Sequence, residues 1–70
     1  MTAPKYKPGV SPDPERVKAL RERYDLTQEQ AAALIYAQRR TWQDWERGVA
    51  VMHPGLWELF CVKVGAIKLS

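Results

Sequence analysis

The chain has 70 residues, which is enough for one hydrophobic core and too few for two. Hydrophobic residues make up 46% and charged residues 27%, an ordinary globular balance that excludes a wholly disordered chain. No apolar run approaches the roughly 20 residues that span a bilayer, and the N-terminus lacks the apolar stretch of a secretory signal, so we expect a cytoplasmic protein. The net charge of +3 favours an anionic partner.

The sequence contains no pattern typical of an enzyme or of a metal-binding protein. Cys61 is the single cysteine, so it cannot form an internal disulfide, and no Cys/His pair has metal-ligand spacing. There is no nucleophile–base pair, glycine-rich phosphate loop or carboxylate dyad. We therefore expect no enzyme, no metal and no cofactor. Cys61 is interpreted as a small buried hydrophobe, and His53, before Pro54, as a cap or surface residue.

The N-terminal segment, residues 1–11, contains prolines and a glycine without helical or alternating periodicity, which predicts a flexible arm. Residues 12–70 are expected to form one helical domain. Its first helix is predicted to follow a cap at Ser11 or Asp13 and to run for about three turns. The apolar positions of this helix recur at i, i+3 and i+7: Val17, Leu20 and Tyr24.

A second helix is predicted to begin after Thr27, which can form a capping box with Gln30, and to continue to Ile35. Residues 36–38 interrupt the pattern. A third helix then spans Arg39 to Arg47 and stops at Gly48. After a loop at 49–53, a fourth helix is predicted from Pro54 to near Gly65. No segment has the alternation of a strand, so the predicted fold class is all-α.

Two short helices joined by a tight turn, the second carrying consecutive arginines, are typical of a helix-turn-helix that reads DNA. Such a second helix must project polar side chains on one face and be held by large apolar groups on the other. Arg39 and Arg40 open the third helix, and Trp42 and Trp45 occupy inward positions.

The segment from Leu26 to Gly48, LTQEQAAALIYAQRRTWQDWERG, resembles the helix-turn-helix of the lambda-repressor/Cro (xenobiotic-response-element) family without a gap. Leu-Thr-Gln-Glu at the start, Ala32 at the helix–helix contact and Trp-Glu-Arg-Gly at the end carry the resemblance. With the flanking helices it covers about residues 16–63. It implies a compact four- to five-helix lambda-repressor-like domain that binds double-stranded DNA as a homodimer, one third helix entering the major groove at each half of an inverted repeat.

The resemblance assigns roles to individual positions. The base-reading positions are Gln38, Arg39, Arg40 and Asp44. The positions near the DNA backbone are Gln28, Thr41, Gln43 and Arg47. Asp44 could accept from cytosine N4 or orient Arg40 through an i, i+4 ion pair. Arg21 and Glu46 match a buried ion pair of some family members.

The sequence also departs from the family pattern. Tyr36 stands where glycine is usual, so the turn either carries a steric cost or takes another form. Trp42 replaces a smaller aliphatic residue, and the small Ala31 leaves space that the indole can fill. Gln38 replaces the usual serine or threonine and is a weaker N-cap.

Some features have a structural interpretation beside the functional one. Arg39 and Arg40 could form an ordinary solvated face. The three tryptophans, Trp42, Trp45 and Trp57, are interpreted as core and not as a base-stacking platform. Lys5-Tyr6-Lys7 could lie in a minor groove or be disordered.

Dimerisation is predicted to use the apolar residues Val64, Ile67 and Leu69, with the loop at 49–52 and the fourth helix. The predicted function is a dimeric repressor of its own operon. Chains of this size and motif include phage Cro-like repressors, antitoxins and anti-CRISPR-associated autorepressors, which the residues do not separate. The alternatives are an antitoxin or adaptor that binds a co-encoded protein, and a non-specific nucleic-acid binder whose affinity follows salt and not sequence.

Overall fold

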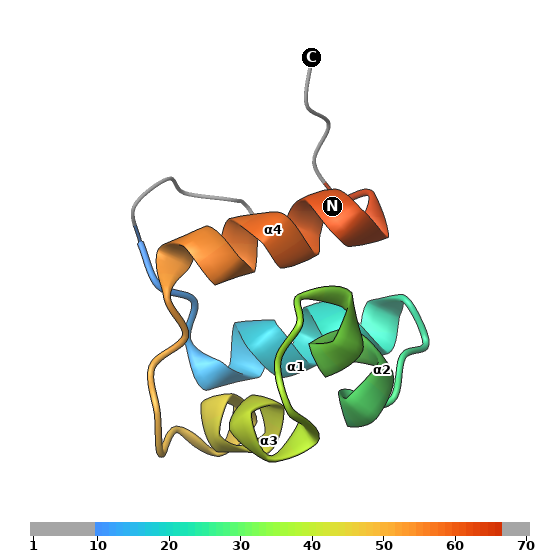
Figure 1. Ribbon diagram of the computed structural model, residues 1–70. Coiled ribbons are helices and arrows are strands. Elements are labelled where there is room, and N and C mark those ends of the chain that lie inside the picture. The colour runs from blue at the N-terminus through green and yellow to red at the C-terminus, as the bar shows by residue number, and fades with distance from the viewer. Residues whose placement is uncertain (1–9, 67–70) are drawn as a thin grey trace.

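The computed structural model describes residues 10–66, which fold into four α-helices without a strand (Figure 1). These are α1 (Pro14–Arg23), α2 (Gln28–Leu34), α3 (Arg39–Arg47) and α4 (Pro54–Val64). In Figure 1, α4 lies along one side of the molecule and α3 along the opposite side, with α1 and α2 between them. The predicted all-α class is confirmed. Most of the predicted arm, and the tail residues Ile67 and Leu69, lie outside the described residues.

Side chains satisfy the free amides at the start of three helices. Asp13, one of the two predicted caps of α1, accepts from the backbone N–H of Arg16 at 2.8 Å. The predicted capping box of α2 is present, with Thr27 and Gln30 each bonding the other's backbone N–H at 3.0 Å. His53 caps α4 by accepting from Gly55 N–H at 2.9 Å. Gln38 makes no such bond at the start of α3, as predicted for a weak cap.

The ends of α3 and α4 follow the predicted glycines. Gly48 and Gly65 take left-handed conformations with φ of 77° and 85°, which glycine adopts without steric cost. The backbone N–H of Val49 then reaches the carbonyl of Asp44 at 3.0 Å and closes the last turn of α3. Helix α2 ends at Leu34, one residue before the predicted end, with Ile35 as its C-cap.

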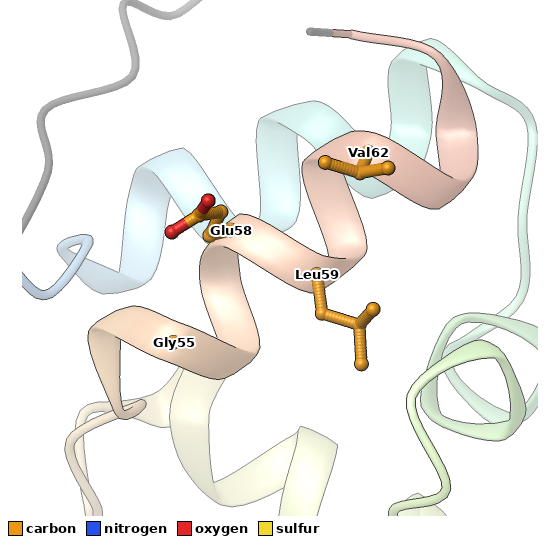
Figure 2. Close-up of a pocket in the computed structure, with 4 residues that line it drawn as sticks. All are labelled: Gly55, Glu58, Leu59 and Val62. Carbon is orange, nitrogen blue, oxygen red and sulfur yellow. The ribbon is translucent and has the colours of Figure 1, made fainter. Parts of the chain in front are cut away.

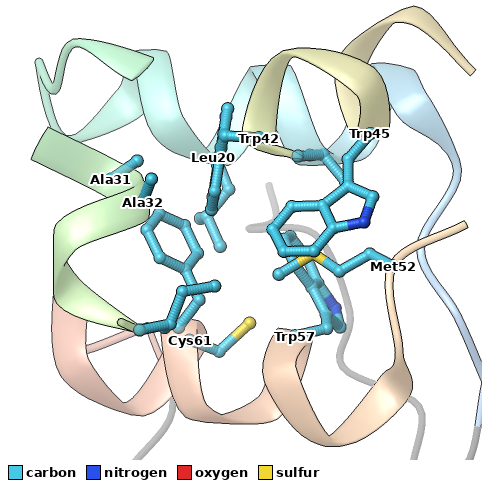
Figure 3. Close-up of a cluster of buried hydrophobic side chains, with 11 residues drawn as sticks. Leu20, Ala31, Ala32, Trp42, Trp45, Met52, Trp57 and Cys61 are labelled. Atoms are coloured by element: carbon cyan, nitrogen blue, oxygen red, sulfur yellow. The ribbon is translucent and has the colours of Figure 1, made fainter. Parts of the chain in front are cut away.

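One aromatic-rich core joins all four helices (Figure 3). The Trp42 ring lies 4.8 Å from that of Phe60 and 5.7 Å from that of Trp45, between centroids. Trp42 and Ala31 are both fully buried. The core consists of Val17, Leu20, Ala31, Ala32, Ile35, Trp42, Trp45, Met52, Trp57, Phe60 and Cys61.

The three tryptophans are therefore core residues, as predicted. Cys61 is buried as well, and burial raises the pKa of its thiol to about 11, so it remains protonated near neutral pH.

Tyr36, in the turn between α2 and α3, keeps the left-handed backbone that the family usually gives to glycine. Its φ is 62°. Its backbone N–H reaches the carbonyl of Ala33 at 3.3 Å, and that of Ala37 reaches the carbonyl of Ala32 at 2.9 Å, the pattern of a Schellman helix end. Of the two outcomes expected here, the turn is retained and the tyrosine carries the steric cost.

Candidate nucleic-acid interface

Helix α3 presents a polar face to solvent and a tryptophan face to the core. Trp42 and Trp45 are buried, whereas Arg39, Arg40 and Arg47 are exposed. Gln43 and Asp44 are half-buried. They lie three to five residues from both Arg39 and Arg40, so all four residues share one side of the helix. The tryptophans thus hold the helix while its other face offers cationic and amide groups to a ligand.

Seven of the eight predicted DNA-contacting residues lie on or next to α3, and the structure brings the eighth to the same helix. Gln38, Arg39 and Arg40 are exposed at its N-terminal end. Thr41 is half-buried. Gln28, at the start of α2, touches α3 through Gln43.

Asp44 does not pair with Arg40, which was one of its two expected roles. Its carboxylate lies 3.9 Å from the Arg47 guanidinium instead, in an i, i+3 pair. This pair is largely solvated and contributes little to stability.

A largely buried ion pair fixes α3 to the rest of the domain, close to what the resemblance implied. Arg21, from α1, donates through Nε to Glu46 Oε2 at 2.6 Å and through a terminal nitrogen to Oε1 at 3.1 Å. The side chains are 13% and 6% exposed. A third Arg21 nitrogen donates to the carbonyl of Leu26 at 2.9 Å, so one guanidinium ties α1, the loop before α2 and α3 together.

The Glu46 carboxylate is an acceptor for three different side chains. Besides Arg21, it accepts from the indole N–H of Trp42 and from Gln28 Nε2. Burial alone would raise the pKa of Glu46, but the hydrogen bonds from Arg21, Trp42 and Gln28 outweigh it and hold the pKa below its ordinary value. The hydrogen bond to Glu46 correspondingly raises the pKa of Arg21. Glu46 is therefore ionised near neutral pH.

Gln28 and Gln43 form an amide bridge between α2 and α3. Gln43 Nε2 donates to Gln28 Oε1 at 3.1 Å, and Gln28 Nε2 donates to Glu46 Oε1, also at 3.1 Å. Sequence reasoning placed both glutamines beside DNA but did not find this bridge, because the residues are 15 positions apart and only the packing of α2 on α3 brings them together.

Lys63, from α4, contacts the unusual tyrosine of the turn, which no sequence signal indicated. Its Nζ donates to the Tyr36 hydroxyl at 3.2 Å and lies 4.5 Å from the centre of the ring. Tyr36 is 85% exposed, so this contact is the main one its side chain makes and it links the turn to α4.

The predicted dimerisation residues are only partly placed. Val64 is half-buried and packs against the core, while Ile67 and Leu69 lie outside the described residues. The α3–α4 loop exposes Val49 and Val51, 66% and 78% accessible. This loop is the exposed apolar part of the predicted dimer surface.

A shallow depression on the outer side of α4 is lined by Gly55, Glu58, Leu59 and Val62 (Figure 2). All four residues belong to α4, and the depression is separate from the polar face of α3. Within residues 10–66, no three His, Cys, Asp or Glu side chains gather as metal ligands, and no helix is long and apolar enough to cross a membrane.

Comparison with known proteins agrees with this geometry. Residues 15–67 match the helix-turn-helix domain family, and the chain belongs to that family. It is a helix-turn-helix domain of the DNA-binding class, with α2 and α3 as the two helices of the motif. A stretch of 51 residues, 73% of this chain, is 41% identical to the Type II methyltransferase M.MspI of Moraxella sp. That stretch covers 12% of the length of the methyltransferase.

Proposed function

We propose that the chain is a sequence-specific transcriptional regulator of lambda-repressor/Cro type that represses its own operon as a dimer. The observation that carries this proposal is the exposed polar face of α3, held in place by two buried tryptophans and the Arg21–Glu46 pair. Arg39 and Arg40 extend from the N-terminal end of α3, where a recognition helix contacts base edges.

In this proposal, base reading falls to Gln38, Arg39, Arg40 and Asp44. An arginine can donate two parallel hydrogen bonds to O6 and N7 of guanine, and the planar guanidinium matches that spacing. The helix N-terminus of α2 and the side chains of Gln28, Thr41 and Arg47 would bind phosphates and set the register.

The similarity to a methyltransferase is limited to a helix-turn-helix stretch that makes up 12% of that protein. It supports a DNA-binding role for this stretch and gives no basis for a methyltransferase activity here. The proposed mechanism is therefore occupancy of a promoter, which needs no reaction.

The test is fluorescence anisotropy at fixed salt with DNA from upstream of the chain's own operon and with a scrambled duplex. We expect the upstream DNA to bind at least a hundredfold more tightly, and Arg39→Ala and Arg40→Ala to remove most of that preference. Lys18→Ala is the matched control, because it removes one exposed positive charge from α1 and should change both affinities equally. Equal, salt-limited binding to both duplexes would favour a non-specific binder or a protein-interaction module.

The dimer is tested separately by sedimentation equilibrium. The double variant Ile67→Asp with Leu69→Asp should be a monomer with weak operator binding, because charges replace apolar tail side chains. A dimer that survives this change would overturn the proposed dimer surface.

A further inference from the structure

The Glu46 carboxylate fixes the orientation of the Gln28 amide, and the Gln28 amide in turn fixes that of Gln43. An ionised carboxylate only accepts hydrogen bonds, so Gln28 must turn its NH2 group towards Glu46. The carbonyl oxygen of Gln28 then faces Gln43 and can take only a donor, so Gln43 must turn its NH2 group towards Gln28. The structure has both bonds, at 3.1 Å each.

These two hydrogen bonds determine which hydrogen-bonding groups Gln43 presents to solvent. The bond to Gln28 uses one N–H of its NH2 group, and the second N–H remains. Among residues 10–66, no side chain or backbone group bonds the Gln43 carbonyl oxygen. Gln43 therefore carries one acceptor and one donor, side by side on a planar amide, in an orientation that its partners set.

Gln43 is also placed where a ligand of α3 would meet it. It follows Arg39 by four residues and Arg40 by three, and it precedes Arg47 by four, so it lies within the exposed face. Its side chain is half-exposed.

We propose that Gln43 is a base-reading residue that selects adenine in each half-site. This deepens the proposed function and rests on it. Adenine presents a donor at N6 and an acceptor at N7 on its major-groove edge, which is the complement of one carbonyl oxygen and one N–H. Guanine presents two acceptors there and would leave the Gln43 carbonyl facing another oxygen.

The same orientation argues against the backbone role that the sequence suggested for Gln43. A phosphate has only acceptor oxygens, so it bonds donors and repels a carbonyl oxygen held beside it. Gln43 could offer a phosphate one N–H, but only with its outward acceptor close to that anion. An adenine uses both groups.

The experiment is selection from a randomised duplex library with the wild-type protein, Gln43→Ala and Gln28→Ala. We expect the wild-type motif to contain an adenine in each half-site at which Gln43→Ala loses roughly tenfold or more of its preference, with the other positions unchanged. Gln28→Ala should weaken the preference at that same position, because the amide of Gln43 is then free to rotate.

A probe duplex with 7-deazaadenine at that position gives a second readout. It lacks the N7 acceptor, so wild-type affinity should fall severalfold while the affinity of Gln43→Ala should not change. A motif that Gln43→Ala retains in full, with uniformly weaker binding, would overturn the assignment in favour of a phosphate contact. A wild-type protein that enriches no motif would overturn the proposed function itself.

Discussion

Replacing Glu46 by alanine tests whether one buried carboxylate holds the helix-turn-helix together. The change leaves the Arg21 guanidinium, the Trp42 indole N–H and the Gln28 amide without their shared acceptor. Arg21 is 13% exposed, so water reaches it poorly and cannot replace the lost carboxylate in full.

The expected loss is large for a chain of this size. Removal of one partner from a buried ion pair costs about 3–5 kcal/mol, and a core of fewer than 80 residues rarely supplies more than about 5 kcal/mol in total. We therefore expect Glu46→Ala to be close to its unfolding midpoint at 25 °C without denaturant. The double variant Arg21→Met with Glu46→Leu should recover much of the loss, because it removes the uncompensated charge.

The assay is urea unfolding followed by far-UV circular dichroism, with Glu22→Ala as the control. Glu22 is an exposed acid on α1, and its removal should change the free energy of unfolding by less than about 0.5 kcal/mol. A loss of under about 1 kcal/mol for Glu46→Ala would refute the reasoning, because that is the value of a solvated surface pair.

Other substitutions and pH test further features of the domain. The pKa of Glu46 is lowered in the folded state, so its contribution to stability should be complete above the ordinary carboxyl value of 4.5 and should be lost as the pH falls through the lower folded-state pKa. In the same urea assay, the free energy of unfolding of Glu46→Gln should fall less steeply with decreasing pH than that of the wild type. Tyr36→Gly should be more stable than Tyr36→Ala by about 1 kcal/mol, since glycine takes a φ of 62° without strain and both changes remove the Lys63 contact; equal stabilities would show that this turn is not strained. Gly48→Ala should lower the free energy of unfolding by about 1 kcal/mol, because alanine is strained at a φ of 77°. The added Cβ would meet Pro14 Cγ at 3.5 Å, an ordinary contact distance that adds no further cost, so a loss above about 3 kcal/mol would contradict this reasoning. Gln38→Ser should raise the thermal midpoint by several degrees, because it adds the missing cap of α3, and no rise would mean that another group already satisfies those amides.

Most of the fold could be predicted because its signals are local. Capping residues and stop glycines lie in the sequence directly beside the helices whose ends they mark. For this reason α3 was predicted at the residues it occupies. The inward spacing of Trp42 and Trp45 likewise identified the buried face of α3 from one turn of sequence.

The details of the site depend on contacts between distant residues, which no local pattern contains. The pair Arg21 and Glu46 was reached only through the family resemblance, since 25 positions separate them. The Gln28–Gln43 bridge and the Tyr36–Lys63 contact were not predicted at all. Asp44 was expected to pair with Arg40 if it paired at all, and only the side-chain geometry shows that its partner is Arg47.

The two faces of α3 have separate tasks, and this division has an evolutionary consequence. Arg39 and Arg40 point to solvent and contribute nothing to the tryptophan core, so mutation can exchange them without unfolding the chain. Gln43 differs, because its amide is bonded through Gln28 to the carboxylate that anchors the helix. Under the proposed function, descendants of this chain would acquire new DNA targets readily through the arginines, while the position occupied by Gln43 would change more slowly.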